Sequence, residues 1–140
     1  MKLNVLVDTC FWISLFDPTD DPKLTVEAER ISEEIEDEEI IIPFPTLYEF
    51  VNSRLSRREA KTEFEKLLLK PNVTRLSDVK YKEKALENFF LKSKYEHSDI
   101  SLVDEVLKLI IDDKQIKIDY IVSFDSGLIR EALSKGVKQI

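Results

Sequence analysis

The sequence has few of the residues that build covalent or soft-metal centres. Among its 140 residues there is one cysteine, Cys10, and one histidine, His97. A single thiol excludes an internal disulfide and a cysteine metal cluster, and it suits a reducing compartment. One histidine without a Gly-x-Ser-x-Gly turn gives no support to a serine hydrolase. We expect Cys10 to be a small buried side chain and His97 a loop or helix-cap residue.

Long apolar runs and hairpin turns are also missing. No stretch approaches the ~20 apolar residues of a membrane-spanning helix. The apolar residues before Asp8 are too few for a signal peptide, so we expect a cytoplasmic protein without membrane contact. Only two glycines occur, and there is no Asn-Gly signal for a tight antiparallel hairpin.

Net positive charge is absent as well, since the formal net charge is −7. A protein that coats nucleic acid is normally basic, so this balance argues against that class. It leaves open an enzyme that meets phosphates through bound cations. A compact basic patch interrupts the acidic chain and could guide RNA, or could be an ordinary solvated helix face: Arg54, Arg57, Arg58 and Lys61.

The sequence does contain apolar strands that alternate with amphipathic helices within one domain spanning residues 1–140. We predict strands at 3–7, 39–43, 73–76 and 120–123, and a last edge strand at 137–140. We predict a short apolar helix or turn at 11–16, and helices at 24–37, 56–69, 78–95, 101–113 and 126–135. A further helix is expected to open at Thr46, with Leu47, Phe50 and Val51 inward. This alternation favours an α/β fold with a mainly parallel sheet and helices on both faces.

Four carboxylates fall where such a sheet places its functional sites. Open parallel sheets bind ligands at the carboxyl ends of their strands. Asp8 ends the first strand and Asp125 follows the fourth. Glu49 and Asp104 lie in the first turns of helices that begin near the same edge. We therefore expect all four side chains to converge.

Each acid also has an ordinary structural explanation. Asp8 and Asp125 fit helix N-caps, while Thr46–Glu49 and Ser101–Asp104 fit capping boxes. Together, however, the acids would repel one another, because a pair ~5 Å apart costs about 3 kcal/mol at an effective dielectric of 20. Such a cluster needs protonation or a bound cation. Oxygen ligands without Cys or His favour Mg²⁺ or Mn²⁺ over zinc.

Four short segments resemble the acidic motifs of PIN domains, in the expected order and at ordinary spacing: Val7-Asp8-Thr9, Thr46-Leu-Tyr-Glu49, Ser101-Leu-Val-Asp104 and Ser123-Phe-Asp125. The length is similar to that of VapC-type toxins, the ribonuclease half of toxin–antitoxin pairs. The resemblance implies a three-layer α/β/α sandwich and an endoribonuclease that uses Mg²⁺ or Mn²⁺. It implies that the four acids bind metal or act in catalysis, with Thr9 and Ser123 as supporting polar groups. It also implies an RNA substrate, an antitoxin partner and a homodimer.

One position departs from the pattern, and other functions stay open. Many PIN domains have Ser or Asn where this chain has Cys10, and a thiol donates hydrogen bonds poorly.

Haloacid-dehalogenase-like phosphatases would need a second Asp at the position of Cys10. A receiver domain would need paired acids and a late lysine that we do not find. A PIN-like binding module without catalysis and an RNA-processing nuclease that is not a toxin remain alternatives.

Overall fold

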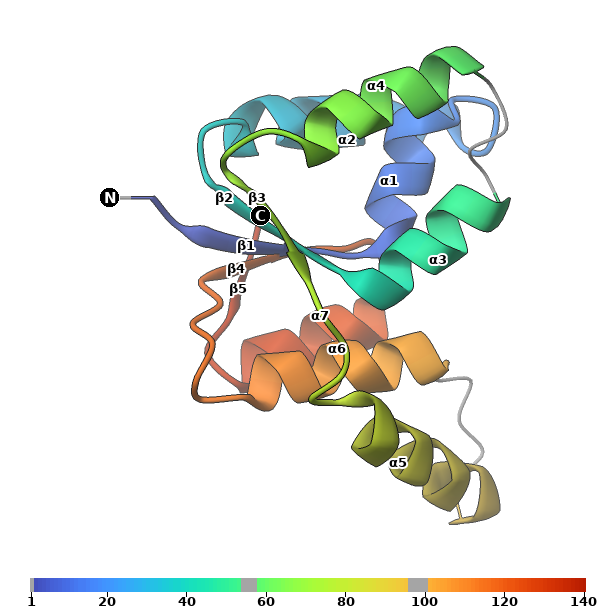
Figure 1. The fold of residues 1–140 in the computed structure, drawn as a ribbon, viewed down its shortest axis with the longest axis vertical. Helices are drawn as coiled ribbons and strands as arrows, with labels where there is room; N and C mark the ends of the chain where they lie inside the picture. Colours follow the sequence, from blue (N-terminus) through green and yellow to red (C-terminus); the bar gives the residue numbers. More distant parts are fainter. Residues whose placement is uncertain (1, 54–57, 96–100) are drawn as a thin grey trace.

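A five-stranded parallel sheet forms the centre of the computed structural model, which describes residues 2–53, 58–95 and 101–140 (Figure 1). The strands lie in the order β3-β2-β1-β4-β5. Every neighbouring pair runs parallel, as the alternation of strands and helices predicts. Their bounds are β1 (Asn4–Val7), β2 (Glu39–Pro43), β3 (Val73–Leu76), β4 (Tyr120–Val122) and β5 (Lys138–Gln139).

Side chains of β1 enter two separate hydrophobic cores. Val5, Leu6 and Val7 are all fully buried. Successive side chains of a strand point to opposite faces of the sheet. Accordingly Val5 and Val7 join one core and Leu6 joins the other. The continuous apolar run therefore fits a central strand that is covered on both sides.

Helices cover both faces and complete three layers (Figure 1). The core that contains Val5 is packed by α1 (Thr9–Phe16), α2 (Pro22–Ile35), α3 (Phe44–Ser53) and α4 (Arg58–Leu68). The core that contains Leu6 is packed by α5 (Lys82–Tyr95), α6 (Leu102–Asp112) and α7 (Ser126–Ser134). The α/β/α sandwich is confirmed. Helix α5 extends away from the sheet and contacts α6.

An aromatic cluster fills the first core. Phe64 makes edge-on contacts with Trp12, Phe16 and Phe50 at centroid distances of 5.5, 5.5 and 4.9 Å. Such geometry contributes about 0.5–1.5 kcal/mol per pair beyond area burial. The aromatic residues that follow Asp8 thus hold α1 against α3 and α4.

Three details differ from the sequence-based expectation. Helix α3 begins at Phe44, directly after β2, so Thr46 is inside the helix and is not its N-cap. Leu47 and Phe50 are buried as predicted, but Val51 is 41% exposed. Helix α5 begins at Lys82, because residues 78–81 form a turn closed by hydrogen bonds to the Asp78 carbonyl.

Within the described ranges, no helix is both long and apolar enough to cross a membrane. Arg54, Arg57 and His97, which the sequence analysis singled out, lie outside the described residues.

Candidate active site

Asp8 is the buried acid of the site, with 6% of its surface exposed. It follows β1 and caps α1, and its Oδ1 accepts a hydrogen bond of 2.7 Å from the backbone N–H of Thr9. The hydroxyl of Ser123 donates to its Oδ2 at 2.9 Å. Its own N–H donates to the carbonyl of Val122, which ties the ends of β1 and β4 together. Burial raises the pKa of Asp8 although these hydrogen bonds oppose the rise.

Cys10 is half-buried and makes polar contacts, which corrects the expectation of an inert buried group. Its thiol lies 3.4 Å from Oδ2 of Asp8, to which it donates, and accepts from the backbone N–H of Phe124 at 3.2 Å. Burial raises the pKa of Cys10 to about 12. The thiol therefore stays protonated at neutral pH and remains a weak donor to Asp8.

The side chain of Thr9 joins Glu49 to this group. The hydroxyl of Thr9 donates to its Oε1 at 2.7 Å, so Thr9 holds Glu49 while its backbone holds Asp8. The capping box expected at Thr46 and Glu49 is absent, because the Thr46 hydroxyl instead donates to the carbonyl of Pro43 at 2.7 Å. Glu49 is exposed on α3.

Asp104 and Asp125 occupy helix N-termini, as their spacing predicted. Ser101 and Asp104 form a capping box at the start of α6. Asp125 caps α7 and accepts from the N–H of Leu128 at 3.0 Å. The N–H of Asp125 also donates to the Ser123 hydroxyl at 3.0 Å, so Ser123 links this loop to Asp8.

Mutual repulsion connects three of the acids. Burial raises the pKa of Asp104, and the negative charge of Asp125 raises it further. The charge of Asp104 in turn contributes to the raised pKa of Asp8. The fourth acid, Glu49, is held near the other three by its hydrogen bond from Thr9. The structure therefore brings the four predicted acids to one edge of the sheet, beyond β1 and β4.

A cation near the acids was missed by the sequence analysis. Lys108 lies on α6 one turn after Asp104, and its charge acts to lower the pKa of that carboxyl. The i,i+4 spacing of Asp104 and Lys108 was the available signal. By contrast, Arg58 and Lys61 are exposed at the start of α4. The charges that shift the pKa values of Asp8 and Asp104 come from the other acids and from Lys108.

The four carboxylates have the right chemistry to bind a hard cation, but their side chains are not arranged around one ion. Carboxylate oxygens are the ligands that Mg²⁺ and Mn²⁺ prefer. Within the described part of the chain, however, no group of three or more Asp, Glu, His or Cys side chains is arranged to hold a metal ion. Glu49 and Asp125 are exposed, so a change of their side-chain rotamers would break the hydrogen bonds to Thr9 and Leu128 but would not disturb a core.

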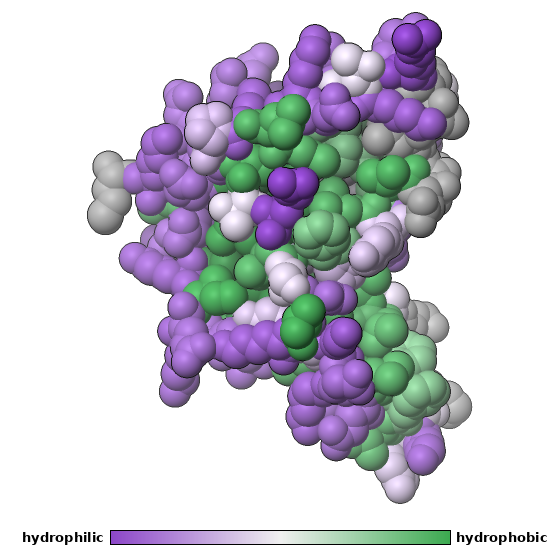
Figure 2. Space-filling model, viewed as in Figure 1, coloured by the Kyte–Doolittle hydropathy of each residue, from purple (hydrophilic) through white to green (hydrophobic). Residues whose placement is uncertain are grey.

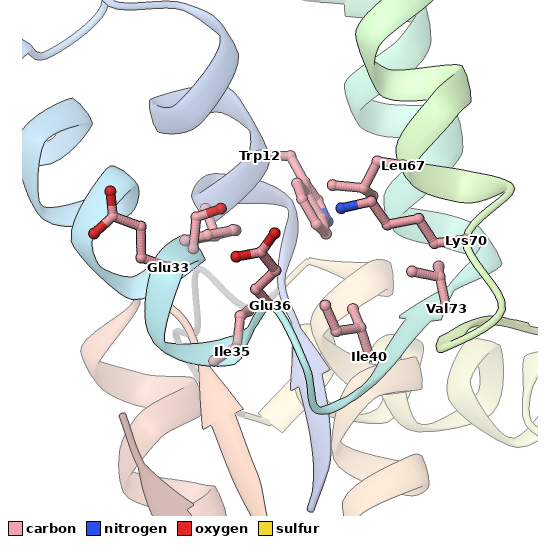
Figure 3. Close-up of a pocket in the computed structure, with 10 residues that line it drawn as sticks. Trp12, Glu33, Ile35, Glu36, Ile40, Leu67, Lys70 and Val73 are labelled. Carbon is pink, nitrogen blue, oxygen red and sulfur yellow. The ribbon is translucent and has the colours of Figure 1, made fainter. Parts of the chain in front are cut away.

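A separate hollow of about 230 Å³ lies away from the acids (Figure 3). It is framed by Ile40 and Val73, near the first residues of β2 and β3, together with Trp12 and Lys70. The indole N–H of Trp12 is buried without a hydrogen-bond partner in the described structure. Because the acids follow the opposite ends of the strands, this hollow is not part of the candidate active site.

The fold resembles that of a solved structure, and the sequence matches a known family. The crystal structure of Mycobacterium tuberculosis VapC20, a sarcin–ricin loop cleaving toxin, superposes with a TM-score of 0.67. The match covers 89% of this chain and 92% of that one at 19% sequence identity. No curated protein gives a significant match. The family model of the PIN domain matches residues 5–132, so the chain belongs to the PIN domain family.

Proposed function

We propose that this protein is an endoribonuclease that uses Mg²⁺ or Mn²⁺ at Asp8, Glu49, Asp104 and Asp125. The observation that carries the proposal is the convergence of the acids at the carboxyl edge of a parallel sheet. Thr9 links Asp8 to Glu49, and Ser123 links Asp8 to the backbone of Asp125. Asp104 lies near enough for its charge to act on Asp8 and for the charge of Asp125 to act on it. A fold gains nothing from placing several negative charges next to one another in a partly buried group, whereas a bound cation turns the same charges into a binding site.

Each acid has a part that follows from its environment. Asp8 is fixed by Thr9 and Ser123, so it offers a preset ligand. Asp104 and Asp125 approach from α6 and α7. Glu49, oriented by the Thr9 hydroxyl, completes the ligand set or orients the attacking water.

A divalent ion bound there would supply a water of lowered pKa and would stabilise charge on the phosphoryl oxygens. Attack by water with departure of the 3′-oxygen leaves a 5′-phosphate on the product. Thr9, Ser123 and the protonated Cys10 thiol keep Asp8 and Glu49 in place during this step. Their hydrogen bonds are the kind of support that tunes metal sites.

Membership of the PIN family and the likeness to VapC20, described as an RNA-cleaving toxin, support RNA as the substrate. On that basis we propose a VapC-type toxin that acts in the cytoplasm as one domain and is neutralised by a protein antitoxin. Arg58 and Lys61, with Arg54 and Arg57 beside them in sequence, would guide the RNA strand.

We also propose a homodimer formed through α5. This helix leaves large apolar and aromatic side chains exposed, among them Leu86, Phe90, Leu91 and Tyr95. Figure 2 shows hydrophobic surface beside hydrophilic surface at the lower end of the molecule, where Figure 1 places α5. Contiguous exposed apolar surface commonly marks an interface with another protein. Sedimentation of a Leu91→Glu variant should show a monomer where the wild type sediments as a dimer.

The activity is tested with purified protein, a pool of randomised single-stranded RNA and Mn²⁺, with the new RNA ends read by sequencing. We expect cleavage by the wild type, loss of cleavage in EDTA and at least a hundredfold loss for Asp104→Asn. Asp112→Asn is the matched control, since it makes the same change at the far end of α6, where Asp112 pairs with Lys135.

Equal cleavage by the wild type and Asp104→Asn would reject the assigned site. Failure of every RNA, together with no stabilisation of the fold by Mn²⁺, would favour the alternative of a binding module without catalysis. Cleavage of a structured RNA alone, without a toxic effect on growth, would favour an RNA-processing enzyme.

A further inference from the structure

A second hollow opens beside the acids, with a volume of about 250 Å³. It lies between α3, the turn before α5, and the first turns of α6. Glu49 lines one side of it, so the hollow and the candidate active site share a residue. Most of the remaining wall is apolar and comes from Pro45, Leu102, Val103 and Val106.

An aromatic ring forms one wall of this hollow. Tyr48 is 61% exposed, so much of its side chain is open to a ligand. The neighbouring ring of Phe44 packs against it at a centroid distance of 6.1 Å and an angle of 49°. That contact supports the ring of Tyr48 from one side, while the rest of the side chain stays open.

Two charged groups complete the hollow. Asp78 supplies hydrogen-bond acceptors and Lys82 supplies donors. Their spacing is fixed by the turn before α5, in which the N–H groups of Tyr81 and Lys82 donate to the Asp78 carbonyl at 2.9 Å. The hollow therefore combines an aromatic platform, apolar walls, an acceptor and a donor.

We propose that this hollow binds one unpaired nucleobase of single-stranded RNA, next to the phosphate that is cleaved. This inference rests on the proposed ribonuclease function and adds its base recognition. A nucleobase has flat faces that stack on aromatic rings and an edge that carries both donors and acceptors. Tyr48 stacks on the base, while Asp78 accepts from its edge and Lys82 donates to it.

The position of Glu49 indicates which part of the RNA the hollow would bind. A phosphate held at the acids is joined to its base through one ribose, so the base must lie in an adjoining space. The hollow that Glu49 lines is such a space. Tyr48, Asp78 and Lys82 are therefore specificity-determining residues that read the base and take no part in the chemistry.

The test compares base frequencies at each position around the cut in a randomised RNA pool. The wild type should show a preference at one position adjoining the cut. Tyr48→Leu should weaken RNA binding about tenfold, as expected for loss of one stacked base. It should also weaken the base preference, because the base is no longer held against Asp78 and Lys82, and Tyr48→Phe should retain both. Lys82→Gln should change which base is preferred, whereas Lys84→Gln, one half-turn further along α5, should not.

A second measurement does not depend on cleavage. Mononucleotides titrated into isotope-labelled protein without metal should shift the methyl signals of Val103 and Val106, and Tyr48→Leu should abolish the shifts. Unchanged base frequencies in Tyr48→Leu and Lys82→Gln, in an active enzyme, would overturn the inference and leave the ribonuclease intact. A Tyr48→Leu variant that dissociates a wild-type dimer would assign the hollow to a subunit interface instead. If no RNA is cleaved, the proposed ribonuclease function fails. If mononucleotides also cause no methyl shifts in the wild type, the inference that the hollow binds a nucleobase fails as well.

Discussion

The hydroxyl of Ser123 donates a hydrogen bond of 2.9 Å to Oδ2 of Asp8, across 115 positions of sequence. The same hydroxyl accepts from the backbone N–H of Asp125 at 3.0 Å. One small side chain therefore orients the buried acid after β1 and fixes the loop that carries a second acid after β4. The alignment of the two acids depends on it.

We expect Ser123→Ala to raise the Mn²⁺ concentration needed for half-maximal cleavage by about 10- to 100-fold, the range typical for loss of a group that orients a metal ligand. Ser134→Ala is the control, because the hydroxyl of Ser134 donates to the Glu131 carbonyl in the exposed last turn of α7, away from the acids. A metal requirement that is equal in both variants would mean that Ser123 does not position Asp8 for metal binding.

Asp8→Asn should stabilise the metal-free protein at neutral pH. The pKa of Asp8 is raised chiefly by burial, with repulsion from Asp104 as a smaller cause, so its ionised form is disfavoured in the fold. A neutral amide of the same shape removes that penalty. Urea unfolding in EDTA should give a higher midpoint for the variant, and a lower midpoint would show that the charge of Asp8 stabilises the metal-free fold.

The pair of Lys80 and Asp113 should make stability depend on pH in acid. The ammonium of Lys80, the N–H of Gln115 and the hydroxyl of Tyr81 all donate to Asp113, and they lower its pKa to about 2. The folded pKa is below the unfolded value of about 3.9, so this stabilisation is complete above that value and is lost as the pH falls through about 2.

The measurement is the difference in free energy of unfolding between the wild type and Asp113→Asn. It should be constant above about pH 5 and should shrink progressively between about pH 4 and pH 2. A difference that does not change with pH would show that the hydrogen bonds around Asp113 do not favour its ionised form.

Lys92 should be needed for the docking of α5 on α6. Its ammonium lies 2.5 Å from Oε1 of Glu105, a carboxylate that is only 2% exposed. Lys92→Met leaves that buried charge unpaired and should destabilise the fold by about 2 kcal/mol, somewhat below the usual loss for a fully buried pair because Lys92 is partly exposed. The control, Lys84→Met, removes an exposed pair and should change stability by less than about 0.5 kcal/mol.

A second variant separates the two sources of that loss. Lys92→Met combined with Glu105→Met removes both charges and should recover part of the stability. A double variant that is as unstable as the sum of the single ones would show that the two residues act independently.

The position of Asp8 and Asp125 could be predicted because it depends on local pattern alone. Each follows a buried apolar strand, and parallel strands place such residues at one edge. The capping box of Ser101 and Asp104 could be predicted for the same reason, since its hydrogen bonds span only three residues. In these cases the sequence neighbours of a residue are also its neighbours in space.

Contacts across the chain were not predictable in the same way. The hydrogen bond from Thr9 to Glu49 spans 40 positions and depends on how α3 packs beside α1. Thr46 fits a capping box by spacing, yet α3 begins two residues earlier, so its hydroxyl turns back to Pro43. The burial of Glu105 against Lys92 likewise follows from helix packing, which no short pattern encodes.

The most direct measurement of the central claim is isothermal titration of Mn²⁺ into the wild type and into Asp8→Asn, both without RNA. If the acids form one cation site, the wild type binds Mn²⁺ and Asp8→Asn binds it at least tenfold more weakly, with Asp112→Asn unchanged. Equal Mn²⁺ binding by the wild type and Asp8→Asn would contradict a metal site at the four acids.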